Sequence, residues 1–300
     1  MEILVCVKRV PMVGGRIVVT ADGQDVDTRM SGFTVSPHEE CAVEEAVRLV
    51  ERHGGRVTVL TLGPAAAADQ LRDMLALGAS RAVLLETDGR EFGPVATADA
   101  IVTAVRSSPA PGDPGAPSAA GGPGAPSAAG GPGAPSAAGG PGGPLASGGP
   151  GAPPTPGCPY DLLLFGNEAA DTGDYQVGVR VAHALGLPCV TGIKNLEVTD
   201  GGARAKREYR GTEEAFDIPL PAVVSVKEGI NLPRYPSLPG RLRAKRATIE
   251  RQEPEWRPEG LRKERLRVPV GESKRAAVLG TGPEAVPALL ALLDELGVLS

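Results

Sequence analysis

Short apolar runs alternate with amphipathic segments through the first hundred residues. Runs of strand length with β-branched residues occupy residues 2–10, 56–63 and 81–87. Each of these runs is followed by a segment in which apolar positions recur at helical spacing. These segments are residues 36–55, 65–78 and 94–105. This alternation is typical of βαβ units, so it predicts a parallel sheet with helices on both faces.

The segment "SPHEECAVEEAVRLVERHGG", residues 36–55, has the best-marked helix ends. Ser36 is a candidate N-cap, and Pro37 suits the first helical position. Glu39 stands three residues after Ser36, as a capping box requires. The two glycines at 54 and 55 end the predicted helix. Its apolar stripe consists of Val43, Ala46, Val47 and Val50.

The alternation is interrupted between residues 107 and 159, which are mostly Gly, Pro, Ala and Ser. The motif "GAPSAAGGP" occurs here three times in tandem, from residues 115, 124 and 133. A repeat without large apolar residues cannot bury enough surface to offset the entropy of ordering it. We therefore predict a disordered insert in a connection between a helix and a strand.

The pattern resumes after the insert. In chain order it has an apolar run at 160–166, a loop at 167–174, a helix at 175–186, an apolar run at 188–194, polar alternating segments near 195–200, 203–209 and 213–218, a strand at 221–229 and a final leucine-rich helix at 283–297. The expected fold is therefore α/β, an open doubly wound and mostly parallel sheet with a C-terminal extension. The expected parts are 1–106 and 160–240 for the α/β domain, 107–159 for the insert, and 241–300 for a basic arm and helix.

Composition and charge argue against some classes of function. A net charge of −5 and 3% aromatic residues argue against nucleic-acid binding. Residues 234–267 nevertheless hold eleven Lys and Arg against five Glu, so electrostatic steering would belong to this region. Residues 2–10 are too short for a signal peptide, and no apolar run reaches 18 residues. We therefore expect a cytoplasmic protein without direct membrane insertion.

The loop "FGNEAADTGDYQVG", residues 165–178, is the best candidate for ligand binding. It leaves the carboxyl end of a predicted parallel strand and enters a helix, where open α/β sheets bind ligands and free N–H groups attract anions. Gly166, Gly173 and Gly178 permit close backbone approach. Asp171 and Asp174 serve either such a site or simple capping, and a metal site is the least favoured interpretation because no histidine is near in sequence.

Other motifs carry little chemistry. Gly280, Gly282 and Ala285 have dinucleotide-turn spacing, but too few residues follow for a βαβ unit, so a strand-turn-helix tail is the expected structure here. The three histidines are scattered, and no arrangement of Ser, His and Asp or of Cys and His emerges. The four cysteines lack metal-like spacing, and we interpret them as structural thiols. We expect neither a metal site nor catalytic residues.

Residues 228–246, "EGINLPRYPSLPGRLRAKR", fit neither a core strand nor a flexible linker. The prolines exclude a central strand, while Ile230, Leu232 and Tyr235 are larger and more apolar than a linker needs. Arginine and lysine residues follow these apolar residues closely, in the second half of the segment. This pattern predicts an exposed segment stiffened by its prolines, and the residues alone leave open what it contacts.

Four stretches together resemble the beta subunit of electron transfer flavoprotein, including its nitrogen-fixation and electron-bifurcating forms. They are "ILVCVKRV" at 3–10, "SPHEECAVEEAVRL" at 36–49, "GNEAADTGDYQVG" at 166–178 and "LPAVVSVKEGINLPRYPSLPGRLRAKR" at 220–246. The resemblance covers about residues 1–106 and 160–250, and the last stretch is the most specific.

The resemblance implies an adenine-nucleotide-binding, Rossmann-like subunit that acts as an electron carrier and does no chemistry on a substrate. It implies an alpha-subunit partner that shares FAD with this chain and contacts its C-terminal region, and an AMP, or in bifurcating members a second FAD, held by this chain. Electrons would arrive from dehydrogenases, such as acyl-CoA dehydrogenase in fatty acid oxidation, and leave toward a quinone oxidoreductase.

The resemblance also implies residue roles. Docking of the dehydrogenase would fall to Ile230 as anchor, with Leu232, Arg234 and Tyr235 beside it. The nucleotide would contact Cys6, Ser36, Pro37, His38, Glu39, Leu62, Gly166, Ala169, Asp171, Gln176 and Val177.

Two departures from the family are notable: His38 replaces an aromatic residue that can face the flavin, and Leu232 replaces the commoner glutamate before Pro233. Structural binding of AMP is the first expectation, and a second FAD in place of AMP is the alternative. A different class is a stand-alone adenine-nucleotide sensor similar to universal stress proteins. It would lack flavin, and the leucine-rich C-terminal helix argues against it because a solitary arm needs less apolar surface. An adenylate-forming synthetase is disfavoured, because no phosphate-binding Gly/Ser loop follows the first strand.

Overall fold

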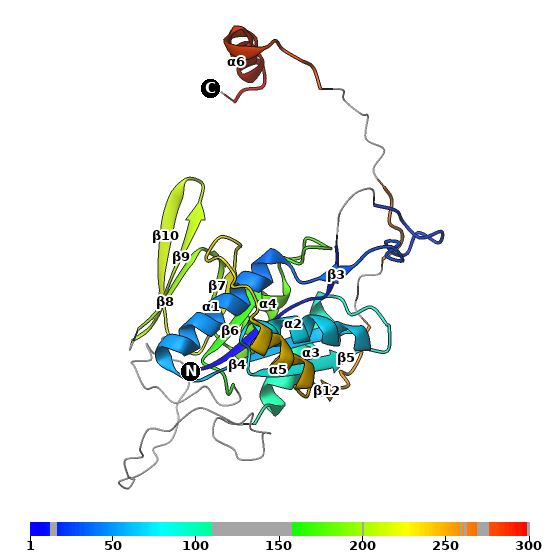
Figure 1. The fold of residues 1–300 in the computed structure, drawn as a ribbon, viewed down its shortest axis with the longest axis vertical. Coiled ribbons are helices and arrows are strands. Elements are labelled where there is room, and N and C mark those ends of the chain that lie inside the picture. Colours follow the sequence, from blue (N-terminus) through cyan, green and yellow to red (C-terminus); the bar gives the residue numbers. More distant parts are fainter. Residues whose placement is uncertain are drawn as a thin grey trace. The chain divides into compact units, whose positions relative to one another are not determined.

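The computed structural model divides the chain into two units (Figure 1). One comprises Met1–Gly14 with Thr28–Arg262, and the other comprises Gly15–Asp27 with Lys263–Ser300. The residues it describes are 1–12, 17–109, 158–199, 201–258, 260, 263–268 and 276–298. Most of the predicted insert, residues 110–157, lies outside them.

The first unit is built on a seven-stranded sheet in which every neighbouring pair of strands is parallel. The strand order is β12-β5-β4-β1-β6-β11-β7. This confirms the predicted fold class. The strands are β1 (Glu2–Cys6), β4 (Arg56–Gly63), β5 (Arg81–Glu86), β6 (Leu162–Gly166), β7 (Cys189–Ile193), β11 (Ala222–Val226) and β12 (Glu250–Gln252).

Helices cover both faces of this sheet, as the continuous apolar strands require. Helices α1, α2 and α5 contribute to the core on one face, and α3 and α4 pack on the other. Their bounds are α1 (Pro37–His53), η1 (Ala65–Ala67), α2 (Ala68–Leu77), α3 (Pro94–Ser107), α4 (Val177–Leu185) and α5 (Leu238–Arg246). Each of the predicted helices before residue 200 is present.

Helix α1 forms where its local signals predict. The Ser36 hydroxyl accepts a hydrogen bond from the Glu39 amide at 3.3 Å, and the Glu39 carboxylate accepts one from the Ser36 amide at 3.1 Å. Gly54 follows the helix with φ of 73°, a conformation that favours glycine. The predicted capping box is therefore confirmed, and it fixes where the helix starts. The stripe that includes Val43, Ala46 and Val47 is buried against the sheet.

Two smaller sheets accompany the large one. Strands β8 (Asn195–Thr199), β9 (Gly202–Tyr209) and β10 (Thr212–Ile218) form an antiparallel sheet from the polar alternating segments. Their apolar positions join the core, whereas opposite charges pair across the strands, as Arg207 does with Glu214 at 2.6 Å. Strands β2 (Val10–Pro11) and β3 (Phe33–Thr34) form a short antiparallel pair.

The predicted boundary at residue 240 does not coincide with the structural division. Helix α5 packs against α2, and β12 adds an edge strand to β5. The Arg72 guanidinium donates to the carbonyls of Ala244 and Ala247, and Arg81 forms an ion pair with Glu250. The basic segment therefore continues the α/β unit beyond residue 240, and this unit extends to Arg262.

The second unit contains a short turn region and the C-terminal helix. A bridge joins Val19 and Val26, and the Leu266 amide donates to the Gly23 carbonyl. The final helix is present as η2 (Gly282–Ala285) and α6 (Val286–Glu295), and its leucines are largely exposed. Residues 276–280 form no strand, so the strand half of the predicted strand-turn-helix tail is wrong. Within the described residues, no helix is long and apolar enough to cross a membrane.

Candidate functional site

The candidate site lies where the strand order changes direction. From β1 the chain proceeds to β4 and β5, and then returns to β6 on the other side of β1. Cys6 ends β1 and pairs with Leu60 of β4 and Phe165 of β6. Such a switch point at the carboxyl ends of parallel strands is where open α/β sheets form ligand crevices.

The first turn of α1 reaches these strand ends through Glu39. Its buried carboxylate accepts hydrogen bonds from the amide and the hydroxyl of Ser36, each at 3.1 Å, and from the Lys8 amide at 2.9 Å. Burial raises the pKa of Glu39 to about 8, although these donors favour the ionised form. A Cβ at Gly166 would stand 2.7 Å from the Glu39 Cγ. Glycine at 166 therefore lets β6 end directly against the helix start.

The loop after β6 is closed by its own backbone and by Lys8. The Ala169 amide donates to the Asp174 carbonyl at 2.9 Å, and the Gly173 amide donates to the Ala169 carbonyl at 2.7 Å. The Lys8 ammonium pairs with Asp171 at 2.7 Å. The Asp171 carboxylate also accepts the Thr172 amide, and the Asp174 carboxylate accepts the Gln176 amide. Both aspartates therefore bond within the loop, and neither caps the start of α4.

The starts of α1 and α4 differ in how their amides are satisfied. The start of α1 is capped by side chains, whereas Gln176 before α4 makes no side-chain capping bond. Gly178 in the first turn of α4 packs tightly, since a Cβ there would lie 3.2 Å from the Phe165 ring and 3.3 Å from the Ser225 hydroxyl. The first amides of a helix lack intrahelical partners, so α4 is the better start for an anionic group.

A cavity of about 570 Å³ adjoins this start, between α4 and α3. Two cations, Arg180 and Arg257, line it together with Gln176 and Asp99. The Arg180 guanidinium donates to the Gln176 side chain at 2.8 Å. Positive side chains and helix N-termini at one cavity favour a negatively charged ligand group.

The sequence-predicted nucleotide residues occupy these elements. Cys6, Leu62 and Gly166 stand at or near the ends of adjacent strands, residues 36–39 form the start of α1, and the remaining four belong to the loop 167–176 or to the start of α4. Their binding roles stay predictions. Three polar residues of this region were missed, Lys8, Glu168 and Tyr175, and only the position of Lys8 after the first strand could have indicated it.

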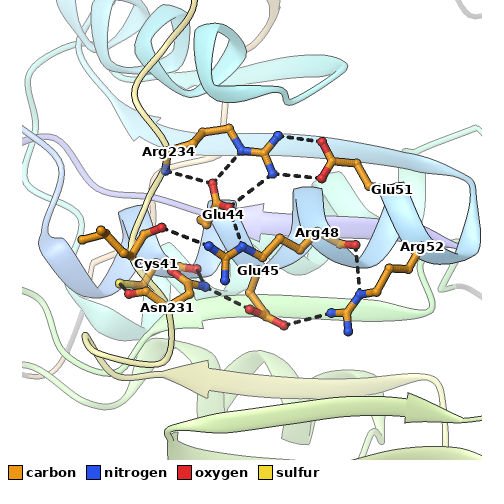
Figure 2. Close-up of polar contacts among 9 residues, drawn as sticks. Cys41, Glu44, Glu45, Arg48, Glu51, Arg52, Asn231 and Arg234 are labelled. Carbon is orange, nitrogen blue, oxygen red and sulfur yellow. Dashed lines mark hydrogen bonds and ion pairs between the residues drawn. The ribbon is translucent and has the colours of Figure 1, made fainter.

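Residues 228–237, here called the docking segment, are held against α1 by polar contacts (Figure 2). The Arg234 guanidinium donates to Glu44 at 2.9 Å and to Glu51 at 2.6 Å. The Asn231 side-chain amide donates to the Cys41 carbonyl at 3.0 Å and to the Glu45 carboxylate at 2.9 Å. The segment is therefore anchored to one face of α1.

The four predicted docking residues lie in two environments. Ile230 is half-buried and packs against the core of its own unit, and Arg234 is engaged by α1. Leu232 is 84% exposed and Tyr235 is 89% exposed. Exposed Leu238 and the cationic side chains of α5 continue this surface, so the outward-facing apolar area comes from Leu232, Tyr235 and Leu238.

Cysteines and histidines form no further site in the described residues. All four cysteines are free, and three of them are buried. Burial raises the pKa of the Cys6 thiol well above its usual range, which makes it a poor nucleophile. Among the described residues, no group of three or more His, Cys, Asp or Glu could hold a metal ion.

Comparison with known proteins identifies the family. The model of the electron transfer flavoprotein domain matches residues 26–112 and 156–255, on either side of the Gly/Pro-rich repeat. The chain belongs to this family. It is 30% identical over 223 residues to the electron transfer flavoprotein subunit beta of Bacillus subtilis, which covers 74% of this chain and 67% of that protein. It is 29% identical over 254 residues to Protein FixA of Azorhizobium caulinodans, covering 83% of this chain and 74% of the relative.

A mitochondrial relative gives the same assignment. The chain is 29% identical over 259 residues to the electron transfer flavoprotein subunit beta of Oryza sativa subsp. indica, covering 85% of this chain and 83% of the relative. The matches thus confirm the predicted family of electron transfer flavoprotein beta subunits and FixA-type proteins.

Proposed function

We propose that this chain is the beta subunit of a heterodimeric electron transfer flavoprotein. It would bind an alpha subunit, share FAD with it, and carry electrons without transforming a substrate of its own. Membership of the family supports this function. The observation that carries the nucleotide part is the joining of two helix starts and three strand ends at the switch point of the sheet.

The residues at this edge fit an adenine nucleotide. The side-chain cap at α1 and the buried Glu39 carboxylate disfavour a phosphate there, so the phosphate would lie at Gln176 and Val177, near Arg180. The adenosine would lie against Cys6, Leu62 and the start of α1. Bound AMP would supply a structural contact only, whereas FAD supplies the electron-carrying ring; this chain's residues bind and orient them.

Electron donors would dock on the segment 228–237. Leu232 and Tyr235 offer exposed apolar area, while Arg234 and the half-buried Ile230 would hold the segment in place. The exposed cations of α5 would steer an acidic partner, and such contacts weaken with salt. Acyl-CoA dehydrogenases are the proposed donors and a quinone oxidoreductase the proposed acceptor, in a cytoplasmic setting.

The test is to purify the chain alone and together with an electron transfer flavoprotein alpha subunit from the same genome, denature both preparations, and identify the released nucleotides by chromatography. One AMP and one FAD per heterodimer would support the proposal. Two FAD without AMP would indicate the electron-bifurcating alternative. A homodimer that releases an adenine nucleotide and binds no flavin partner would indicate the stand-alone sensor. Release of no nucleotide from either preparation would overturn the assignment.

A second assay tests electron transfer itself. The heterodimer is mixed with an acyl-CoA dehydrogenase and its acyl-CoA substrate, and flavin reduction is followed by absorbance under anaerobic conditions. Reduction that saturates with heterodimer concentration and slows at high salt is expected, because the proposed docking surface is partly electrostatic. Salt-independent reduction would contradict the role given to α5.

A further inference from the structure

The His38 side chain lies between the docking segment and the loop that follows β6. The Glu228 amide donates to the His38 Nδ1 at 2.8 Å. On the other side, the His38 Nε2 lies 3.7 Å from one carboxylate oxygen of Glu168. The second oxygen of that carboxylate accepts a hydrogen bond from the Tyr175 hydroxyl. The side chain of His38 is only 17% exposed, whereas that of Glu168 is 34% exposed and Tyr175 is 57% exposed, so the ring is mostly buried while its partners reach the surface.

The hydrogen bond from the Glu228 amide defines which nitrogen of the neutral ring carries the proton. Because Nδ1 accepts from the Glu228 amide, the neutral imidazole carries its proton on Nε2, which faces Glu168. One ring thus accepts from the first residue of the docking segment and presents a donor to the loop after β6. A phenylalanine of similar size could make neither contact.

We propose that His38 is a positioning residue that couples the docking segment to the nucleotide loop 167–176. The inference rests on the proposed nucleotide site and adds a link that the site alone does not require. His38 belongs to the first turn of α1, and its Cβ is close to Gly166 at the end of β6, since a Cβ built at Gly166 would stand 3.4 Å from it. Ordering of the loop by a nucleotide would therefore restrain Glu168, then His38, and then the Glu228 amide.

Hydrogen–deuterium exchange of the heterodimer, followed by mass spectrometry with added AMP and in parallel with added FAD, tests the coupling. In the wild type, nucleotide should slow exchange in a peptide covering 166–177 and also in one covering 227–235. In His38→Phe, with nucleotide raised until the protection of 166–177 is complete, the response of 227–235 should disappear. Exchange at Glu228 should rise by about fivefold even without nucleotide, because one hydrogen bond is lost.

His38→Asn is the matched variant. Its side-chain oxygen occupies roughly the place of Nδ1 and can accept from Glu228, but the shorter side chain does not reach Glu168. We expect Asn to restore the basal protection of Glu228 without restoring its response to nucleotide. It also keeps the test decisive if the Phe variant folds poorly.

The outcomes separate this inference from the proposed function. Protection of 166–177 in the wild type without any response of 227–235 would overturn the coupling and leave the nucleotide site standing. An equal response of 227–235 in the wild type and in both variants would overturn the role of His38. Absence of protection in both wild-type peptides with both nucleotides would overturn the nucleotide site and the coupling with it.

Discussion

Replacing Arg234 by methionine should loosen the docking segment on α1, where Asn231 still holds it, and destabilise the α/β unit. Methionine keeps the length and apolar stem of the side chain but removes the charge that bridges Glu44 and Glu51 (Figure 2). The Glu44 side chain is only 2% exposed, whereas that of Arg234 is 35% exposed. The variant would therefore leave a buried carboxylate with one of its two cationic partners.

The expected loss in the free energy of unfolding depends on which partners Glu44 keeps in the variant. Removing one partner of a fully buried ion pair costs roughly 3–5 kcal/mol. Glu44 keeps Arg48, whose Nε lies 2.6 Å away, and Arg234 is partly solvated, so we expect a loss of about 2 kcal/mol in the free energy of unfolding. A loss of this size lowers the Tm of a unit of this length by about 4–8 °C.

The pH dependence gives a second signature. Burial opposes ionisation of Glu44, but hydrogen bonds from Arg234 and Arg48 outweigh it and hold its pKa below the usual range. A lowered folded-state pKa contributes stability that is present above the unfolded-state pKa and is lost as pH falls through the folded-state value. The difference between wild type and variant should therefore be full at neutral pH and shrink in the acidic range below about pH 4.5.

Urea denaturation followed by circular dichroism, at neutral and at acidic pH, would measure both effects. The matched control is the double variant Glu44→Gln with Arg234→Met, which removes the buried charge along with its partner. We expect this double variant to recover part of the stability that the single variant loses. A single variant within about 0.5 kcal/mol of wild type at neutral pH, or an undiminished loss in acid, would refute the reasoning.

Three further predictions concern the site and the docking segment. Glu39→Gln should flatten the pH dependence of the free energy of unfolding. In the wild type, the pKa of Glu39 is raised to about 8, so the protein loses stability as pH rises from about 4.5 to 8. The slope of this loss is up to about 1.4 kcal/mol per pH unit. Urea titrations across this range would show it, and equal slopes in both proteins would contradict the burial of this charge. Gly166→Ala should lower the free energy of unfolding by about 1–3 kcal/mol and weaken AMP binding measured by calorimetry, because the new Cβ meets Glu39. A variant that binds AMP as tightly as the wild type would contradict the tight contact. Leu232→Ala should slow reduction by the dehydrogenase without changing Tm, whereas Ile230→Ala should lower Tm because Ile230 packs on the core. The reverse pattern in paired stopped-flow and melting experiments would exchange their roles.

Local signals explain why much of the fold was predictable from sequence. The start of α1 is encoded within four residues by Ser36, Pro37 and Glu39, so no distant contact is needed to find it. Strands such as β1 and β4 are buried on both faces and appear as continuous apolar runs. Strand β12 has no such pattern, because its three polar residues are held by backbone pairing with β5 and by the ion pair between Arg81 and Glu250.

The site was predictable to the level of its elements and no further. Parallel strands bring their carboxyl ends to one edge, so the loop after β6 and the start of α1 could be joined from sequence alone. The contact between His38 and Glu228 spans 190 residues, and that between Lys8 and Asp171 spans 163. No local pattern encodes such pairs. Ile230 illustrates the same limit, since an apolar residue among prolines gives no indication of which side faces the core.

Helix α1 gives a physical reason to expect that the proposed cofactor binding and the proposed docking can be separated by mutation. Its first turn, residues 36–39, lies at the proposed nucleotide site, while Glu44, Glu45 and Glu51, further along, hold the docking segment. Changes at Glu51 should therefore alter docking and leave nucleotide content unchanged, because Glu51 is remote from the capping box along the same rigid helix. His38 is the exception, since it bonds the docking segment from the first turn. A variant there should disturb both functions, and this combined effect distinguishes a coupling residue from a residue that merely anchors the loop.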